Sequence, residues 1–254
     1  MIIQGIEIPE ELIKFFTDGR VVIFAGAGVS MQKPSTYPSF ADLANRIAEG
    51  TGLIRNNEDK TPIDQFLGEV AARGVDIKKK AAELLSNSPY NNVHKALLRL
   101  FPSADQIKII TTNFDLLFEK CAIAENIKIP RIFSAPAMPR GKSFSGLVHL
   151  HGDTNYPDEL VLDDKSFGEA YITDSWAARF LTDVCLNYVT VFIGYSFEDT
   201  IMKYLARALS RNSMPRYIIT EEIEKSWTHN GFNKIIYPNQ QYDVHDFSIS
   251  SVMI

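Results

Sequence analysis

Short, unbroken apolar runs that alternate with helical patterns are the feature that most constrains the fold of this 254-residue chain. Residues 20–25, 107–111 and 189–193 are rich in valine, isoleucine and phenylalanine, and helical patterns separate them. Such runs are typical of strands that are buried on both faces, as in a parallel sheet. The order of elements therefore predicts an α/β fold with a doubly wound, Rossmann-like and mostly parallel sheet.

The stretch from about residue 61 to residue 100 has a helical pattern throughout and contains no convincing strand. Helices are expected to begin near Thr61, Asp76 and Asn92. We therefore predict one domain over residues 1–254, with a Rossmann-like core at 1–52 and 106–254 and a helical insert at about 53–105.

The remaining patterns predict the other elements of the core. Ser39 is expected to cap a helix that runs through Ala48. Further helices are predicted at residues 9–16, 114–122, 176–186 and 199–209, and further strands at 127–132, 147–151, 160–162, 217–219 and 234–237.

Composition and charge exclude several classes of partner. The chain has 26 basic and 31 acidic residues, so its net charge of −5 gives no sign of a nucleic-acid surface. No apolar run is long enough to cross a bilayer, and the N-terminus lacks the pattern of a signal peptide. The only cysteines, Cys121 and Cys185, are too few for a four-cysteine zinc site. We therefore expect a cytoplasmic protein that binds no metal, contacts no membrane and does not bind nucleic acid directly.

Ligands of doubly wound sheets bind at the carboxyl ends of the strands, so the residues that follow each predicted strand are the place to look. The first strand leads into Gly-Ala-Gly-Val-Ser at residues 26–30. Backbone N–H groups in such a turn can approach an anionic group, although a tight turn that needs glycine for a positive φ is an equally good interpretation. A dinucleotide fingerprint would need glycine where Met31 stands, so a hydride-transferring dehydrogenase is a poor fit.

Two more strands end in polar clusters. Residues 111–115 read Thr-Thr-Asn-Phe-Asp, where a helix cap at Thr112 or Asn113 would need only one of these polar side chains. Residues 148–153 read Val-His-Leu-His-Gly-Asp, and strand alternation would place His149 and His151 on one face. Because further metal ligands are missing nearby, a single catalytic histidine at His151 is the favoured interpretation.

The fourth cluster is Ile-Gly-Tyr-Ser-Phe-Glu-Asp at residues 193–199. A nucleophile elbow would need glycine two residues after Ser196, where Glu198 stands, so serine-hydrolase chemistry is disfavoured. A glycine-serine turn after a buried strand is better suited to hydrogen-bonding a ribose or a phosphate.

Taken in this order, the four clusters resemble the motifs of the sirtuin superfamily: Gly-Ala-Gly-x-Ser, Thr-x-Asn-x-Asp, His-Gly and a late Gly-x-Ser, within residues 25–199. The flanking residues are more similar to the divergent bacterial branch of that superfamily, which includes NAD-hydrolysing effectors of anti-phage defence. The resemblance implies NAD⁺ as the substrate. It also implies a homo-oligomer, a separate sensor domain or a partner chain.

The resemblance implies a role for each matching residue. Asn113 would lie beside the nicotinamide ribose, and His151 would be the catalytic histidine. The residues that would bind NAD⁺ are Ala25, Gly26, Ala27, Gly28, Ser30, Thr112, Asp115, Gly194, Ser196 and Asp199.

Two departures from the protein deacetylases point to the activity. Residues 38–41, Pro-Ser-Phe-Ala, lack the acid and the arginine of the deacetylase Pro-Asp-Phe-Arg motif. Residues 129–164 contain no cysteine, so the usual zinc lobe is not expected. We therefore expect hydrolysis of NAD⁺ to nicotinamide and ADP-ribose. The alternatives are an NAD-dependent protein deacylase or ADP-ribosyltransferase, and a non-catalytic module that senses NAD or ADP-ribose.

Overall fold

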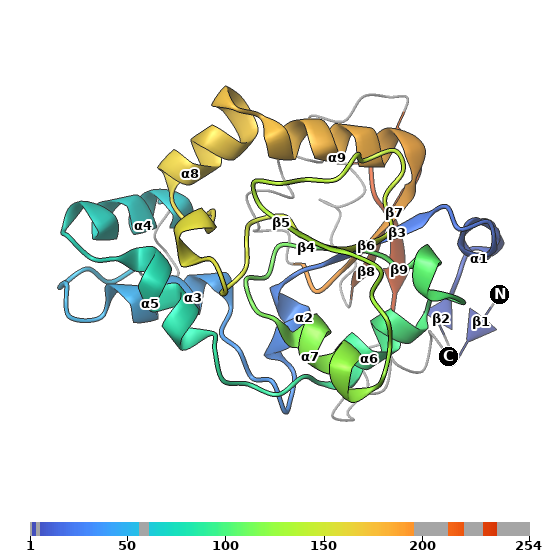
Figure 1. Ribbon diagram of the computed structural model, residues 1–254, viewed down its shortest axis with the longest axis horizontal. Helices are drawn as coiled ribbons and strands as arrows, with labels where there is room; N and C mark the ends of the chain where they lie inside the picture. The colour runs from blue at the N-terminus through green and yellow to red at the C-terminus, as the bar shows by residue number, and fades with distance from the viewer. Residues whose placement is uncertain (1, 4–5, 56–60, 196–212, 221–230, 238–254) are drawn as a thin grey trace.

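A computed structural model describes residues 2–3, 6–55, 61–195, 213–220 and 231–237. Within these ranges a seven-stranded sheet has the order β5-β6-β4-β3-β7-β8-β9, and every neighbouring pair is parallel (Figure 1). Its strands are β3 (Val21–Ala25), β4 (Lys108–Thr111), β5 (Ile132–Ser134), β6 (Gly146–His149), β7 (Val189–Ile193), β8 (Arg216–Thr220) and β9 (Asn233–Ile236). The predicted α/β fold with a doubly wound parallel sheet is confirmed.

Helices cover both faces of this sheet because alternate strand residues point to opposite sides, and both sets are apolar. Val21 and Ile23 belong to a core formed with α1 (Glu10–Thr17), α6 (Asn92–Arg99) and α7 (Leu117–Ala124). Val22 and Phe24 belong to a second core, formed with α9 (Trp176–Asn187) on the other face (Figure 1). The first strand of the sheet, β3, is therefore buried on both sides, as its sequence predicts.

The strand order places a switch point beside β3. After β3 the chain adds β4, β5 and β6 on one side, and it then returns to place β7 directly on the other side. The segments that leave β3 and β7 therefore diverge at the carboxyl edge of the sheet, where doubly wound folds bind their ligands.

A third apolar core lies beside the sheet, in the helical part of the molecule (Figure 1). It joins α3 (Phe40–Ala48), α4 (Ile63–Ala72) and α5 (Ile77–Leu84) to Phe114 and Leu160. The next helix, α6, packs against the sheet core instead. The helical insert at about residues 53–105 stays a prediction. Helix α3 precedes this range, yet it packs in the same apolar core as α4 and α5.

Several helix starts follow from local hydrogen bonds that the sequence predicts. The Ser39 side chain accepts a hydrogen bond from the Asp42 N–H at the start of α3, and Asp76 accepts one from the Lys79 N–H at the start of α5. The cap of α6 is Asn91 rather than Asn92, and its side chain accepts hydrogen bonds from the Val93 and His94 N–H groups.

Three predicted elements differ from the structure. The helix expected at 114–122 begins three residues later, at Leu117. The strand expected at 127–132 lies further along the chain, as β5 at Ile132–Ser134. Residues 160–162 are buried but form no strand, since a short apolar run has the same pattern in a buried loop. The helix expected at 199–209 lies outside the described residues.

The other described elements are short. They are β1 (Ile2–Ile3), β2 (Ile6–Glu7), α2 (Ala27–Met31), η1 (Ala104–Gln106), η2 (Pro157–Glu159), α8 (Asp164–Gly168) and the π-helical turn η3 (Glu169–Thr173).

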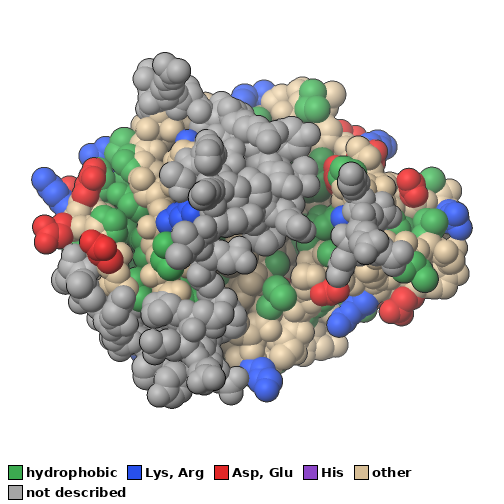
Figure 2. Space-filling view, turned by 180° about the vertical axis from the view of Figure 1, so that it is seen from behind, with side chains coloured by type: hydrophobic (Ala, Val, Ile, Leu, Met, Phe, Trp, Pro, Cys, Tyr) green, Lys and Arg blue, Asp and Glu red, His purple; other side chains and the backbone are tan. Residues whose placement is uncertain are grey.

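The surface carries both signs of charge. Where side chains are coloured in Figure 2, basic and acidic residues are interspersed and form no continuous basic field on the face in view. None of the helices that the structure describes has the length and apolar character needed to span a bilayer.

Candidate active site at the carboxyl edge of the sheet

The glycine turn after β3 packs against the end of β7, backbone against backbone. The Gly26 N–H donates to the Ile193 carbonyl at 2.8 Å, and the Gly28 N–H donates to the Gly194 carbonyl at 2.9 Å. A Cβ on Gly28 would lie 2.8 Å from the Gly194 Cα, and Gly194 itself has a φ of +74°. Close packing at the switch point therefore requires these glycines, and it fixes the two strand ends relative to each other. Neither Gly26 nor Gly28 has the positive φ on which the tight-turn interpretation depended.

We expect Gly28→Ala to destabilise the protein by about 1–3 kcal/mol, because the new methyl group meets backbone that can move only if the turn shifts. Gly168→Ala is the matched control, since a Cβ there has no heavy atom within 4 Å. Because Gly168 has helical backbone angles, this change should not destabilise the protein and should raise the free energy of unfolding by no more than about 1 kcal/mol. Denaturant unfolding measures both changes, and equal stability of the two variants would contradict the close packing.

Asn113 links the turn after β4 to the glycine turn. Its side-chain Nδ2 donates to the Gly26 carbonyl and to the Ser30 hydroxyl, both at 3.1 Å. Its backbone N–H donates to Thr111 Oγ1 at 3.0 Å, and that hydroxyl donates to the Ala25 carbonyl. The helix-cap interpretation of Asn113 is therefore wrong: the amide is part of a link between two strand ends.

Thr112 does not cap the helix either. Its hydroxyl lies 3.1 Å from the hydroxyl of Tyr195, and the Tyr195 hydroxyl also donates to the Ala25 carbonyl at 3.3 Å. Tyr195 directly follows Gly194, so this contact brings the ends of β3, β4 and β7 together. Sequence reasoning missed Tyr195, whose adjacency to the glycine was the available signal.

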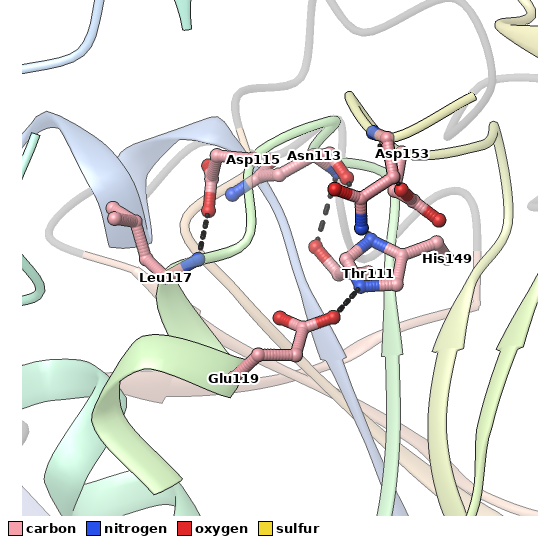
Figure 3. A network of polar contacts seen from close by, with 8 residues as sticks. Thr111, Asn113, Asp115, Leu117, Glu119, His149 and Asp153 are labelled. Atoms are coloured by element: carbon pink, nitrogen blue, oxygen red, sulfur yellow. Dashed lines mark hydrogen bonds and ion pairs between the residues drawn. The ribbon is translucent and has the colours of Figure 1, made fainter. Parts of the chain in front are cut away.

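Ser30 and Asp115 form the buried floor of the site. The Ser30 hydroxyl donates to Asp115 Oδ2 at 2.8 Å, while Asp115 Oδ1 accepts from the Leu117 N–H at 3.0 Å and so fixes the start of α7 (Figure 3). Burial raises the pKa of the Asp115 carboxyl, and these hydrogen bonds oppose that shift. Asp115 is thus a structural link between α2 and α7.

His94 contacts the Ser30 hydroxyl, although the sequence shows no partner for this histidine. Its Nε2 lies 3.3 Å from Ser30 Oγ, and its Nδ1 lies 2.9 Å from Asn91 Oδ1. Burial lowers the pKa of His94 to about 3, so the ring is neutral at neutral pH. The available signal was the spacing of Asn91 and His94, which form a capping box at the start of α6.

His151 lies at the same edge of the sheet, one strand farther along. Strand β6 ends at His149, so the two histidines do not share a face as strand alternation predicted. His149 contacts Glu119 of α7, whereas the His151 ring packs on Phe167 and Tyr171 on the opposite side. The prediction failed because the chain turns after His149, where the Gly152 N–H donates back to the His149 carbonyl.

The His151 imidazole is buried and neutral. Its Nε2 lies 2.8 Å from the Tyr171 hydroxyl. Burial lowers the pKa of His151 to about 3, so the ring keeps one unprotonated nitrogen through the whole neutral range. A neutral imidazole has a lone pair that can accept a proton, as a general base must, although a pKa this low makes the ring a weaker base than a free imidazole.

The predicted site residues are thus arranged in two groups. In the first group, direct hydrogen bonds join Gly26, Ser30, Asn113 and Asp115. Thr112 contacts Tyr195, which in turn donates to the carbonyl of Ala25, the residue before Gly26. His151 follows the neighbouring strand, with Tyr171 as its polar partner. Ala27 and Gly28 lie at the start of α2, between these strand ends. Ser196 and Asp199 lie outside the described residues.

No three histidine, cysteine, aspartate or glutamate side chains are grouped as a metal ion would require within the part of the chain that the structure describes. Cys121 and Cys185 are buried and free.

Comparisons with known proteins give a consistent result. A family model described as a SIR2-like domain matches residues 107–234, about half of the chain. The uncharacterized protein y4cA of Sinorhizobium fredii is 32% identical over an alignment of 234 positions, which covers 81% of this chain and 19% of that protein. The chain is also 28% identical over 238 residues to a protein of Bacillus cereus named NAD(+) hydrolase ThsA, covering 86% of this chain and 47% of that protein.

A third relative, named defense-associated sirtuin 2, comes from Bacillus subtilis. It is 24% identical over an alignment of 233 positions, which covers 85% of this chain and 22% of that protein. The chain therefore spans about half or less of the length of the curated relatives it matches.

Proposed function

Because the chain belongs to the SIR2-like family, we propose that it binds NAD⁺ at the carboxyl edge of the sheet and hydrolyses the bond between nicotinamide and ribose. The products are nicotinamide and ADP-ribose. The observation that carries the proposal is the tethered Asn113 amide, whose Nδ2 is held by Gly26 and Ser30. This tether fixes the direction of the amide oxygen.

The amide oxygen of Asn113 is the atom left for a ligand. Asn113 is only partly buried, and no donor from the described residues is hydrogen-bonded to its Oδ1. A side-chain oxygen that is held in place but unpaired can accept a hydrogen bond from a ribose hydroxyl or from an attacking water. Fixing such an atom in advance contributes to catalysis because no reorganisation is needed during the reaction.

The reaction needs little from the leaving group. Nicotinamide is cationic in NAD⁺ and leaves as a neutral molecule when the bond from its ring nitrogen to ribose C1′ breaks. A water oxygen then bonds to C1′, and the proton that this water loses goes to a base. We assign that proton to the neutral His151 imidazole, which passes it on to solvent.

The relatives support this choice of reaction and suggest a setting. One is named an NAD(+) hydrolase and another a defense-associated sirtuin. We therefore propose that this chain is the NAD-depleting part of a bacterial anti-phage defence system. We place it in the cytoplasm, as a homo-oligomer or together with a separate sensor domain or partner chain.

A nicotinamide-release assay on the purified chain tests the proposed reaction. We expect release from NAD⁺ alone at high protein concentration, which favours assembly, with no increase when an acetylated peptide is added. Peptide-dependent release would instead identify a deacylase or ADP-ribosyltransferase. NAD⁺ binding in a calorimeter without nicotinamide release at any protein concentration would identify a sensing module.

A further inference from the structure

A completely buried histidine lies directly beneath the turn that carries Asn113 (Figure 3). The His149 Nε2 is 2.8 Å from Glu119 Oε1, and its Nδ1 is 3.3 Å from the backbone carbonyl oxygen of Asn113. A carboxylate and a carbonyl oxygen both accept hydrogen bonds and neither donates one. A ring that is protonated on both nitrogens satisfies both contacts while Glu119 is ionised, so this geometry favours an imidazolium cation paired with a carboxylate.

Acidic side chains surround this ring. Glu119 comes from α7, Asp115 from the turn before α7 and Asp153 from the loop after β6. Glu119 Oε2 is buried without a hydrogen-bond partner among the described residues, so the hydrogen bond of this carboxylate goes to His149. Burial by itself lowers the pKa of His149, but Glu119, Asp153 and the Asn113 carbonyl together raise it above its usual value.

We propose that His149 is a positioning residue for Asn113, and that it acts as a cation held between Glu119 and the Asn113 carbonyl. This inference rests on the proposed function, in which Asn113 contacts the substrate. The Asn113 turn is held at its backbone N–H by Thr111, at its side-chain amide by Gly26 and Ser30, and at its carbonyl by His149. The contact with His149 is the one among these that depends on charge.

The pH dependence follows from the two acceptors. When the ring loses a proton at high pH, one nitrogen presents a lone pair to an oxygen that also carries lone pairs, so one of the two contacts becomes repulsive. Nicotinamide release should therefore decline on the alkaline side, as pH rises through the pKa of His149. Removing the charge of Glu119 lowers that pKa, and the decline moves to lower pH.

The test is the pH profile of kcat for NAD⁺ hydrolysis in wild type and Glu119→Gln. We expect the alkaline limb of the variant to shift to lower pH by about one unit or more, the usual effect of one opposite charge in contact. Glu125→Gln is the matched control, because it removes a carboxylate just after the same helix that pairs with Lys95 and Arg99 instead. It should leave the limb in place. A Glu119→Gln variant with lower turnover but an unmoved limb would overturn the proposal.

A second measurement is independent of activity. Long-range ¹H–¹⁵N spectra of the histidine rings should show His149 protonated on both nitrogens at pH 6 in wild type, and a neutral ring would overturn the proposal. Amide hydrogen exchange should then show faster exchange at the Asn113 N–H in Glu119→Gln than in wild type. If wild type releases no nicotinamide while both results hold, the proposed function fails and the positioning role of His149 stands. Unchanged exchange at Asn113 contradicts that role.

Discussion

Asn113→Ala is expected to lower the rate of nicotinamide release by roughly 10²–10³-fold, the usual effect of removing one pre-positioned polar group from a site. The variant loses the amide oxygen that the contacts to Gly26 and Ser30 hold in place. It also loses the side-chain hydrogen bonds from this turn to the Gly26 carbonyl and the Ser30 hydroxyl. The measurement is kcat at saturating NAD⁺, by product analysis of nicotinamide.

Two controls distinguish a loss of the catalytic group from a loss of folded protein. Asn187→Ala removes an exposed amide at the end of α9 whose Nδ2 donates to the Asp183 carbonyl, and it should leave release unchanged. Asn113→Ala should lower the free energy of unfolding by about 1–3 kcal/mol, because the Gly26 carbonyl and the Ser30 hydroxyl lose their donor. A loss of this size should leave the variant folded. Equal release from Asn113→Ala and wild type would exclude Asn113 from the reaction.

The sheet could be predicted from the sequence because its signals are local. The runs that became β3, β4 and β7 are apolar on both faces, and a strand with this pattern needs cover on both sides. The glycines after β3 were found for the same reason, although sequence alone could not decide why they are needed. The structure gives the reason in the contact of Gly28 with Gly194, two residues far apart in the chain.

The errors at the site have one physical origin, which is that strand and helix ends depend on tertiary contacts. Helix α7 begins at Leu117 because Asp115 binds the Leu117 N–H while it also holds Ser30. Strand β6 ends at His149 because the chain turns there, which sends His151 to the other face. Neither event leaves a periodic trace in the sequence.

The pairing of His149 with Glu119 could not be predicted for a related reason. The two residues lie 30 positions apart in the chain, on different elements, and each has ordinary neighbours in sequence. What brings them together is the packing of α7 over β4 and β6. Sequence motifs therefore locate the groups that face a ligand better than the buried groups that hold them.

The largest loss of activity is expected at His151. His151→Gln should lower kcat by roughly 10²–10⁴-fold, the range that a general base contributes. Burial lowers the pKa of His151 to about 3, so the base form persists well below neutrality and kcat/KM should show no acid limb near pH 6.5 from this residue. Nicotinamide release between pH 5 and 8 measures both effects. Turnover close to wild type in a folded His151→Gln protein would exclude this residue as the base.

The burial of His151 also predicts how the stability of the protein depends on pH, and His151→Gln tests that prediction. In wild type the folded ring stays neutral until about pH 3, whereas the unfolded ring takes up a proton below about pH 6.5. Unfolding therefore binds a proton in this window, and His151 makes the protein less stable as pH falls, with a limiting slope of about 1.4 kcal/mol per pH unit. His94 contributes in the same direction, and only the His151 share disappears in His151→Gln. The variant should thus gain stability relative to wild type between pH 6.5 and 5. Parallel curves would show that the folded ring is not held neutral down to about pH 3, and kcat/KM should then show an acid limb near pH 6.5.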